Sequence, residues 1–164
     1  MPHDPVGRLR RWYRDAVRAG IPKPDAMALA TATPDGAPSL RTVLVKRIER
    51  DAIVFFTDFR SRKGRELAQN PRAAALFHWE PLSRQVRLEG HVSALAPDEN
   101  DAYWASRPRE SQLSGATSRQ SARIGSRRAL NERRRRLAAR LGDGPVPRPP
   151  AWGGVRIHIE AIEF

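Results

Sequence analysis

The stretch IVFFTDFRSRKGREL, residues 53–67, joins an apolar segment directly to a strongly basic one. Its first part, Ile53 to Thr57, is rich in β-branched and aromatic residues, which favour a buried strand. Ser61 to Leu67 reads as a short helix, because a serine can cap its first turn and Asn70-Pro71 ends it. A strand that leads into a short basic helix is therefore the first feature that the sequence predicts.

Three cations, Arg62, Lys63 and Arg65, lie at the start of this predicted helix. A helix N-terminus carries roughly half a positive charge and several unpaired N–H groups, so cations are unfavourable there unless an anion lies opposite. A bound phosphate would supply that anion, and Gly64 would allow close approach of the backbone. A solvated basic helix is the alternative, and these residues alone leave both interpretations open.

The composition indicates one domain over residues 1–164, large enough to bury about 70% of its unfolded surface around a single core. The chain has no cysteine, which excludes disulfides and thiolate metal sites. Its four histidines lack close i, i+4 spacing. We therefore expect no metal site, and we expect any cofactor to be organic.

The net charge is +12, from 30 basic and 18 acidic residues, and all but three of the basic residues are arginine. Such a balance favours anionic partners. Nucleic acid is one candidate, for which the run Arg133 to Arg136 is the best support. That run lies within residues 126–141, where Leu130, Leu137 and Leu141 recur at helical spacing. A solvated helix face explains the run better, so we expect no nucleic-acid partner.

No apolar run approaches the roughly 20 residues that span a bilayer, and the N-terminus lacks the apolar core of a secretory signal. The sequence thus predicts a soluble, cytoplasmic protein with no membrane partner.

Turn residues between alternating apolar residues predict a hairpin near the N-terminus. Met27 to Thr33 is expected to form a strand, Thr33-Pro34-Asp35-Gly36 a tight turn, and Ser39 to Lys46 the return strand. Before the hairpin, Asp4-Pro5 begins an amphipathic helix that Gly20 ends. Residues 1–25 are therefore expected to form a helical flank.

Further strands follow the hairpin, and a proline-rich connector, Gly142 to Pro150, leads into the last one. Helices are expected from Pro97 to about Ser106 and from Ser126 onward. Many short strands with few, late helices predict a mainly β fold, a small antiparallel barrel flanked by helices. A barrel this small binds ligands at its rim or at a subunit interface. The strands expected after the hairpin are Ile53 to Thr57, Ala73 to Trp79, Gln85 to Leu95 and Gly154 to Ile159.

Several cations and hydroxyls outside the basic helix are candidates for binding an anion. Arg41 and Lys46 bracket an apolar strand and can aim positive charge at a ligand lying along it. Tyr103 and Arg107 share a helix face, and Ser111 follows the break at Pro108, which together offers good donors for phosphate. A surface lysine, a core-edge tyrosine and an exposed ion pair are the alternative explanations.

Neutral amides supply a second kind of candidate contact. Gln85 lies in a predicted strand and Gln120-Ser121 in a polar loop, and amides can read the donor and acceptor edge of a planar ring. The sequence contains no paired carboxylates, Gly-x-Ser-x-Gly or Gly-x-Gly-x-x-Gly, so hydrolase and Rossmann functions lack support. The residues predict a barrel that binds a phosphorylated planar molecule, and they leave the reaction undefined.

Six motifs occur in an order typical of one known family. They are RTVLVK (41–46), the run from FFTDFRSRK to RQVRLEG (55–90), AYWASRPRESQL (102–113), SRQS (118–121), PVPRPPAWGGVRI (145–157) and IEAIEF (159–164). In this order they closely resemble the pyridoxine (pyridoxamine) 5'-phosphate oxidase family, over about Ala26 to Phe164.

The resemblance implies an FMN-binding split β-barrel that forms a homodimer with its flavin sites at the subunit interface. The cations of the basic helix would then face the FMN phosphate. The substrate phosphate is expected near Lys46, Tyr103, Arg107 and Ser111, and residues 142–164 would begin a C-terminal dimerisation region that is cut short. The expected flavin contacts are Arg41, Thr42, Val43, Leu44, Val45, Lys46, Phe56, Thr57, Arg62, Lys63, Gln85, Gln120 and Ser121.

The reaction implied by the resemblance is oxidation of pyridoxine or pyridoxamine 5'-phosphate to pyridoxal 5'-phosphate. Dioxygen would be the acceptor and hydrogen peroxide the product. The flavin carries this chemistry, so no side chain is assigned as a catalytic acid or base.

The sequence also departs from the family pattern. After a segment like IEAIEF the family continues with a tryptophan and an Arg-x-His-x-Arg-like element, whereas this sequence ends at Phe164. Residues 111–116 lack the family's usual tryptophan, and Phe56 replaces a common tyrosine. These departures leave open a related FMN oxidase for another reduced aromatic, such as a phenazine-like one. A deazaflavin-binding protein, or a non-catalytic protein that binds flavin or pyridoxal phosphate, also stays open.

Overall fold

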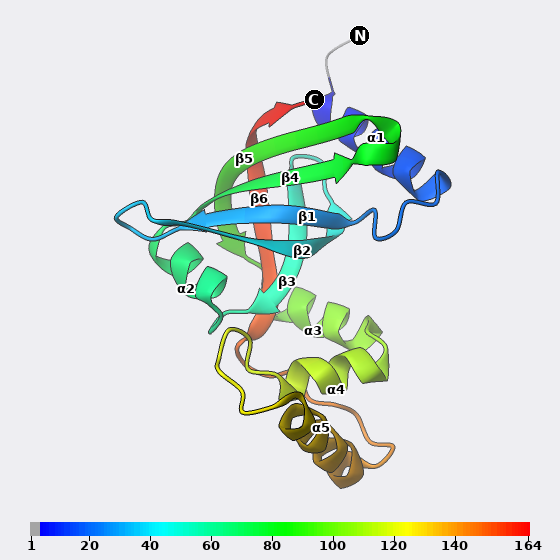
Figure 1. The fold of residues 1–164 in the computed structure, drawn as a ribbon, viewed down its shortest axis with the longest axis vertical. Helices are drawn as coiled ribbons and strands as arrows, with labels where there is room; N and C mark the ends of the chain where they lie inside the picture. Colours follow the sequence, from blue (N-terminus) through cyan, green and yellow to red (C-terminus); the bar gives the residue numbers. More distant parts are fainter. Residues whose placement is uncertain (1–3) are drawn as a thin grey trace. The chain divides into compact units, whose positions relative to one another are not determined.

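Six antiparallel strands close into a barrel in the computed structural model, which describes residues 4–164 (Figure 1). The strands follow the order β1-β2-β3-β6-β5-β4, and β1 pairs with β4 to complete the barrel. The predicted antiparallel barrel and its six expected strands are confirmed. Their bounds are β1 (Ala26–Ala32), β2 (Pro38–Ile48), β3 (Ala52–Asp58), β4 (Arg72–Trp79), β5 (Arg84–Ala94) and β6 (Trp152–Glu163).

Helices begin where the sequence offers caps. Asp4 Oδ1 accepts from the backbone N of Gly7 at 2.7 Å, and Ser126 Oγ accepts from that of Ala129 at 3.1 Å. None of the helices described in residues 4–164 combines the length and apolarity needed to cross a membrane. The helices are α1 (Pro5–Arg18), α2 (Arg62–Gln69), α3 (Pro97–Ser106), α4 (Arg109–Thr117) and α5 (Arg127–Leu141), with a short 3-10 turn, η1 (Glu80–Leu82).

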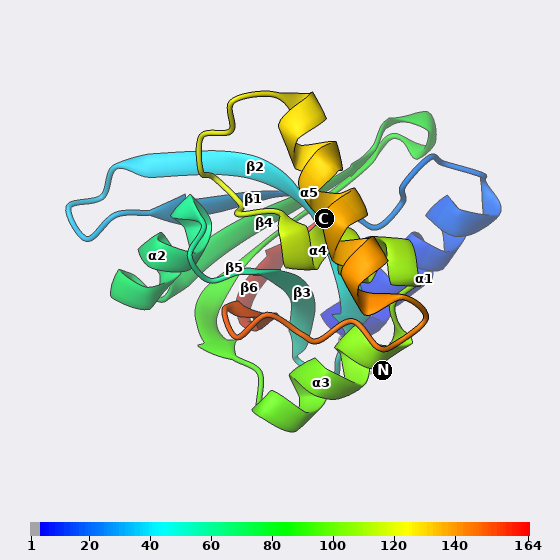
Figure 2. The ribbon, with the colours of Figure 1, turned by 90° about the horizontal axis from the view of Figure 1, so that it is seen from below.

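Helix α4 is not among the elements that the sequence predicts. Pro108 stops α3, as expected, but it also occupies the N-cap position of α4 with φ of −53°. A proline fixes the backbone angle that a new helix needs and has no N–H to leave unpaired. One residue therefore ends one helix and begins the next. Figure 2 shows α4 beside α5, and an ion pair between Glu110 and Arg134 joins them.

The described chain divides into two compact units. The barrel unit comprises the residues up to Phe56, together with Glu66–Ala94 and Gly154–Phe164. The helical unit comprises Thr57–Arg65 and Leu95–Gly153. The expectation of a single domain stays a prediction, and residues 1–3 of its N-terminal flank lie outside the described residues.

The interior of the barrel unit is filled by inward-facing side chains. On β1, buried residues alternate with half-buried ones along the strand. The Nε1 atom of buried Trp79 donates to the carbonyl oxygen of Pro24 at 3.0 Å, so burying this ring leaves no polar atom unpaired. Each fully buried large side chain contributes about 1.5–3 kcal/mol. Among the largest are Trp79, Phe55, Phe77, Leu29 and Ile157.

The barrel unit also carries apolar residues on its outer surface. Leu40 is 69% exposed and Leu44 is 37% exposed, and their partners across the β1–β2 ladder are alanines. Leu76 on β4 lies on the same side, because it pairs with Ala28. A contiguous exposed apolar patch is typical of an interaction surface. This outer apolar face consists of Ala26, Ala28, Ala30, Leu40, Leu44 and Leu76.

The β5–β6 ladder requires a glycine at one point. The register shifts between Glu89 and Gly90, and Gly90 pairs with Ile159. A Cβ atom at Gly90 would lie 1.7 Å from the carbonyl oxygen of His158. Only glycine allows the two backbones to approach this closely.

Gly90→Ala is expected to destabilise the fold by about 1–3 kcal/mol, because the two strands must separate to admit the methyl group. Thermal unfolding followed by circular dichroism measures the change. Gly125→Ala is the matched control, since a Cβ atom there meets nothing within 4 Å. Equal melting temperatures for the two variants would contradict the close approach.

Candidate functional site

Lys63 is the centre of a polar cluster in the helical unit. Its residue is only 5% exposed, and its ammonium donates to Thr57 Oγ1 at 3.0 Å, Gln120 Oε1 at 2.7 Å and Ser61 Oγ at 3.4 Å. The Thr57 hydroxyl donates to the same Gln120 oxygen at 2.9 Å. Three of the residues predicted to contact the flavin, Thr57, Lys63 and Gln120, are therefore brought together.

The N-terminus of α2 is capped as the sequence predicts. Ser61 Oγ accepts from the backbone N of Gly64 at 3.2 Å. The backbone N of Arg62 donates to Ser121 Oγ, also at 3.2 Å. Ser121 has φ of 65°, a left-handed conformation that costs a non-glycine residue about 1–3 kcal/mol. Such strain is concentrated at functional sites, and here it places a predicted flavin contact against the helix end.

Gly64 permits a close backbone approach, although the neighbour is the protein itself. A Cβ atom at this position would lie 2.3 Å from the carbonyl oxygen of Phe59. The glycine therefore lets the first turn of α2 fold back tightly on the residues that follow β3.

An ion pair between Asp58 and Arg60 lies next to the Lys63 cluster. Asp58 is buried, and its carboxylate accepts from Arg60 Nε at 3.0 Å, Arg60 Nη2 at 2.8 Å and the Arg60 backbone N at 2.8 Å. Burial raises the pKa of Asp58, but the hydrogen bonds from Arg60 outweigh burial and hold the pKa below its usual value. The carboxylate is thus ionised at neutral pH and fixes the turn that precedes α2.

In the barrel unit, Arg41 belongs to a network around a buried carboxylate. Glu66 is 4% exposed and accepts from the hydroxyls of Thr31 and Ser39 and from Arg41 Nη2, the last at 3.4 Å. Arg41 Nη1 also donates to Thr31 Oγ1 at 2.6 Å and to the carbonyl oxygen of Leu29 at 3.1 Å. Glu66 is not among the residues predicted from the sequence, where it stands out only as an acid within an otherwise basic helix.

Lys46 lies at an irregularity of β2. The register with β3 shifts between Val45 and Arg47, so Lys46 is the extra residue of a β-bulge. Its ammonium donates to Asp25 Oδ2 at 2.7 Å. As alternation predicts, Lys46 shares the exposed face of β2 with Thr42 and Leu44.

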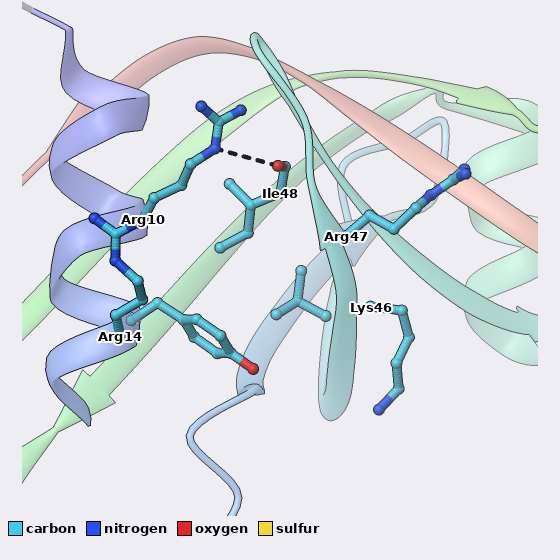
Figure 3. A pocket seen from close by; sticks show the side chains of 7 residues that line it. Arg10, Arg14, Lys46, Arg47 and Ile48 are labelled. Atoms are coloured by element: carbon cyan, nitrogen blue, oxygen red, sulfur yellow. Dashed lines mark hydrogen bonds between the residues drawn. The ribbon is translucent and has the colours of Figure 1, made fainter. Parts of the chain in front are cut away.

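A pocket of about 250 Å³ adjoins the Lys46 bulge (Figure 3). Arg10 and Arg14 extend from α1, whereas the Lys46 and Arg47 side chains leave β2 on the side away from α1. The sequence predicts α1 as a flanking helix and does not reveal that its residues line a pocket. The pocket is lined by Arg10, Tyr13, Arg14, Val45, Lys46, Arg47 and Ile48.

The remaining predicted flavin contacts of the barrel unit lie on its strands. Val45 is buried, Val43 and Phe56 are half-buried, and Gln85 is exposed on β5, where it pairs with His78. Their predicted contacts with a flavin stay predictions.

Arg107 in the helical unit packs against two tryptophan rings that also contact each other. Its guanidinium lies 5.0 Å from the ring centre of Trp104 and 4.9 Å from that of Trp152. Burial lowers the pKa of Arg107, an effect that the nearby Tyr103 partly offsets. Within residues 4–164, the buried Nη1 atom has no hydrogen-bond acceptor. A guanidinium with an unused, desolvated donor favours an anionic ligand.

Tyr103 and Ser111 lie on either side of Arg107 in the sequence. The Tyr103 ring is parallel to that of Trp152, with ring centres 6.2 Å apart. Ser111 lies in the first turn of α4, where its backbone N donates to the carbonyl oxygen of Pro108 at 2.9 Å. The turn at Pro108 thus sets the position of Ser111.

The donors in both units suit an organic anion such as a phosphate ester. Lysine, arginine, hydroxyl and capped helix N–H groups are the usual ligands of phosphate. Among the described residues no group of three or more His, Asp or Glu side chains could hold a metal ion. The strand order and the flanking helices are those of a split-barrel protein.

The chain belongs to the pyridoxamine 5'-phosphate oxidase family, whose family model matches residues 13–137. The pyridoxine/pyridoxamine 5'-phosphate oxidase of Rubrobacter xylanophilus is 51% identical over 161 residues, which are 98% of this chain and 74% of that relative. The counterpart from Paraburkholderia phymatum is 50% identical over the same length.

One solved structure is similar over almost the whole chain. It is PhzG from Burkholderia lata in complex with tetrahydrophenazine-1-carboxylic acid, with a TM-score of 0.92 and 34% identity. The superposition covers 99% of this chain and 80% of that one. The split-barrel fold expected from the motifs is confirmed.

Asp58→Asn is expected to lower the melting temperature by about 2–4 °C at pH 7, because the charge-assisted hydrogen bonds from Arg60 weaken. The pKa of Asp58 is depressed, so its contribution is complete above the ordinary value of 3.8 and is lost as the pH falls through the lowered value. The gap between variant and wild type should therefore close in acid.

Melting curves from pH 7 to pH 3 test this pH dependence. Asp143→Asn is the control, because Asp143 is an exposed acid of the same unit. A gap for Asp58→Asn that is independent of pH would show that the carboxylate charge does not stabilise the fold.

Proposed function

We propose that the protein is an FMN-dependent oxidoreductase that oxidises pyridoxamine or pyridoxine 5'-phosphate to pyridoxal 5'-phosphate, with dioxygen as acceptor and hydrogen peroxide as product. The observation that carries the proposal is the Lys63 cluster at the start of α2, in a chain that belongs to the pyridoxamine 5'-phosphate oxidase family. The cytoplasm is the proposed location.

The residues at the start of α2 fit the phosphate of FMN. Three neutral oxygens accept from the Lys63 ammonium, so a phosphate that replaced one of them would substitute a charged acceptor for a neutral one. Arg62 is exposed at the first position of the helix, where the dipole adds to its attraction. The bound isoalloxazine would supply the two-electron chemistry.

The chain's own contribution to the reaction is positional and electrostatic. Arg107, Tyr103 and Ser111 in the helical unit, and Lys46 in the barrel unit, are proposed to bind the substrate phosphate. The buried donor of Arg107 supports this role, because it has no acceptor among residues 4–164. Fixing the phosphate orients the attached ring and makes the reaction effectively unimolecular.

A second candidate function is oxidation of a different reduced aromatic. The similarity to PhzG, at 34% identity and a TM-score of 0.92, favours it. So do Phe56 and the absence of tryptophan from residues 111–116, which distinguish this sequence from the usual oxidase pattern. The residues proposed to bind the flavin would be the same, and only the substrate would differ.

Turnover by the purified, FMN-loaded protein separates the two functions. With pyridoxamine 5'-phosphate in air, we expect equal amounts of pyridoxal 5'-phosphate and hydrogen peroxide. Peroxide formed only with a reduced phenazine carboxylate would support the second function. A colourless protein that does not bind added FMN would contradict both.

We also propose that the protein forms a homodimer through the outer apolar face, with the flavin sites at that interface. Leu40 and Leu44 are exposed large apolar side chains whose partners on β1 are alanines, and a second copy would remove them from water. Small neighbours allow close approach of the two sheets. The face is continuous with β2, which carries several of the predicted flavin contacts.

Replacing Leu40 and Leu44 together by Glu is expected to convert the dimer to a monomer, because each interface would bury four carboxylates without partners. Light scattering coupled to gel filtration measures the mass. Val17→Glu, which changes another exposed apolar residue, is the control. A wild-type monomer would contradict the proposed interface.

Replacing Arg62 and Lys63 by Ala is expected to weaken FMN binding by about 3–6 kcal/mol, because each charge-assisted contact contributes about 1.5–3 kcal/mol. Quenching of flavin fluorescence measures the affinity. Arg62→Ala alone keeps the Lys63 cluster intact, and it should weaken binding at least about tenfold.

Arg133→Ala with Arg135→Ala is the matched control, since it removes two exposed charges from α5. Its FMN affinity should stay within about twofold of wild type. An equal loss of FMN affinity in both double variants would mean that the net charge of the protein, and not the pair Arg62 and Lys63, determines flavin binding.

A further inference from the structure

Lys46 is already engaged by a carboxylate. The distance from its Nζ to Asp25 Oδ2 is 2.7 Å, and the two side chains are only 30% and 21% exposed. The backbone of Asp25 is also fixed, because its main-chain carbonyl oxygen accepts from the backbone N of Val45 at 2.8 Å. The acid at the entrance to β1 is thus held directly opposite the bulge that carries Lys46.

This pairing changes what Lys46 offers to a ligand. The Lys46–Asp25 ion pair has no net charge, so an arriving anion is attracted by the ammonium but repelled by the adjacent carboxylate. In a half-buried position this repulsion is screened less than at the surface. An anion at Lys46 must therefore share the ammonium with Asp25 or displace it.

The charged residues that line the pocket beside the Lys46 bulge are all cations. Arg10, Arg14 and Arg47 line the pocket beside the bulge, and the lining contains no acid. Arg10 Nε donates to the carbonyl oxygen of Ile48 at 3.3 Å, and Arg47 Nε lies 3.4 Å from Glu49 Oε1. Among these lining cations, Lys46 is the one that we propose to bind the substrate. The acid in contact with Lys46 is Asp25.

We infer that Asp25 is a specificity-determining residue, which limits how strongly Lys46 favours a doubly charged phosphate over an uncharged substituent. The inference rests on the proposed function, because it assigns Lys46 to the substrate phosphate. Removing the carboxylate charge leaves the Lys46 ammonium in place and restores its full attraction. The selectivity for phosphorylated ligands should then increase.

The test compares two ligands that differ only in the phosphate. The probes are 4-deoxypyridoxine 5'-phosphate and 4-deoxypyridoxine, whose 4' methyl group can be neither oxidised nor condensed with a lysine. Calorimetric titration of the FMN-loaded protein gives both affinities. Asp25→Asn should bind the phosphorylated probe roughly 3- to 10-fold more tightly, with the unphosphorylated probe changed less than about twofold.

Two further variants give the test its controls. In a Lys46→Met background the Asp25→Asn change should no longer favour the phosphorylated probe, which isolates the coupling between the two residues. Asp35→Asn removes an exposed acid of the same unit at the other end of the β1–β2 hairpin, and it should leave both affinities unchanged.

The outcomes separate this inference from the proposed function. If wild type and Asp25→Asn bind the phosphorylated probe equally, the role of Asp25 is wrong and the proposed substrate stands. If Asp25→Asn gains the same factor with Lys46→Met, the effect is long-range and the pairing with Lys46 is not responsible. If the FMN-loaded wild type binds neither probe, both the proposed substrate and the role of Asp25 are overturned.

Discussion

Burial of the Lys63 ammonium is the constraint on which the candidate site depends. A buried ammonium is costly unless all of its donors find acceptors, and here Thr57, Ser61 and Gln120 supply them. These contacts tie the end of β3, the cap of α2 and the polar loop near residue 120 to one atom. These contacts hold in place the residues proposed to bind the flavin phosphate, which would lower the ordering cost of binding.

The other proposed ligand-binding cations are also held by the protein. Arg41 is fixed by buried Glu66 and the hydroxyls around it, Lys46 is paired with Asp25, and Arg107 packs against two tryptophan rings. The cations therefore differ in how strongly each can attract an anionic ligand, because each has different partners within the protein. Position and local compensation, more than total charge, decide which anion is bound.

Much of the fold could be predicted from local sequence patterns. Apolar alternation and turn residues placed the six strands, and Asp4, Pro97 and Ser126 marked three helix starts correctly. The cap at Ser61 was also readable, because it depends on a neighbour three residues away. Gly64 was expected to admit a phosphate, whereas in the structure it lies against the carbonyl oxygen of Phe59. Helix α4 was missed, because a proline read as a stop also begins a helix.

The partners of the cations could not be read in this way. Glu66 and Arg41, and Asp25 and Lys46, are more than twenty residues apart, and only the register of the barrel strands and α2 joins them. The bulge at Lys46 also could not be predicted from the sequence, because it is a shift in the register of β2 against β3. Long-range pairing of charges depends on tertiary structure, whereas the resemblance to the family supplied the candidate residues without their partners.

The affinities of the apoprotein for FMN and for riboflavin test the proposed phosphate site, because the two ligands differ only in the phosphate. We expect FMN to bind at least about 100-fold more tightly than riboflavin, since two or more charge-assisted contacts would hold the phosphate. This advantage should shrink as the salt concentration is raised. Equal affinities for the two flavins would contradict the assignment of the Lys63 cluster and the start of α2 to the flavin phosphate.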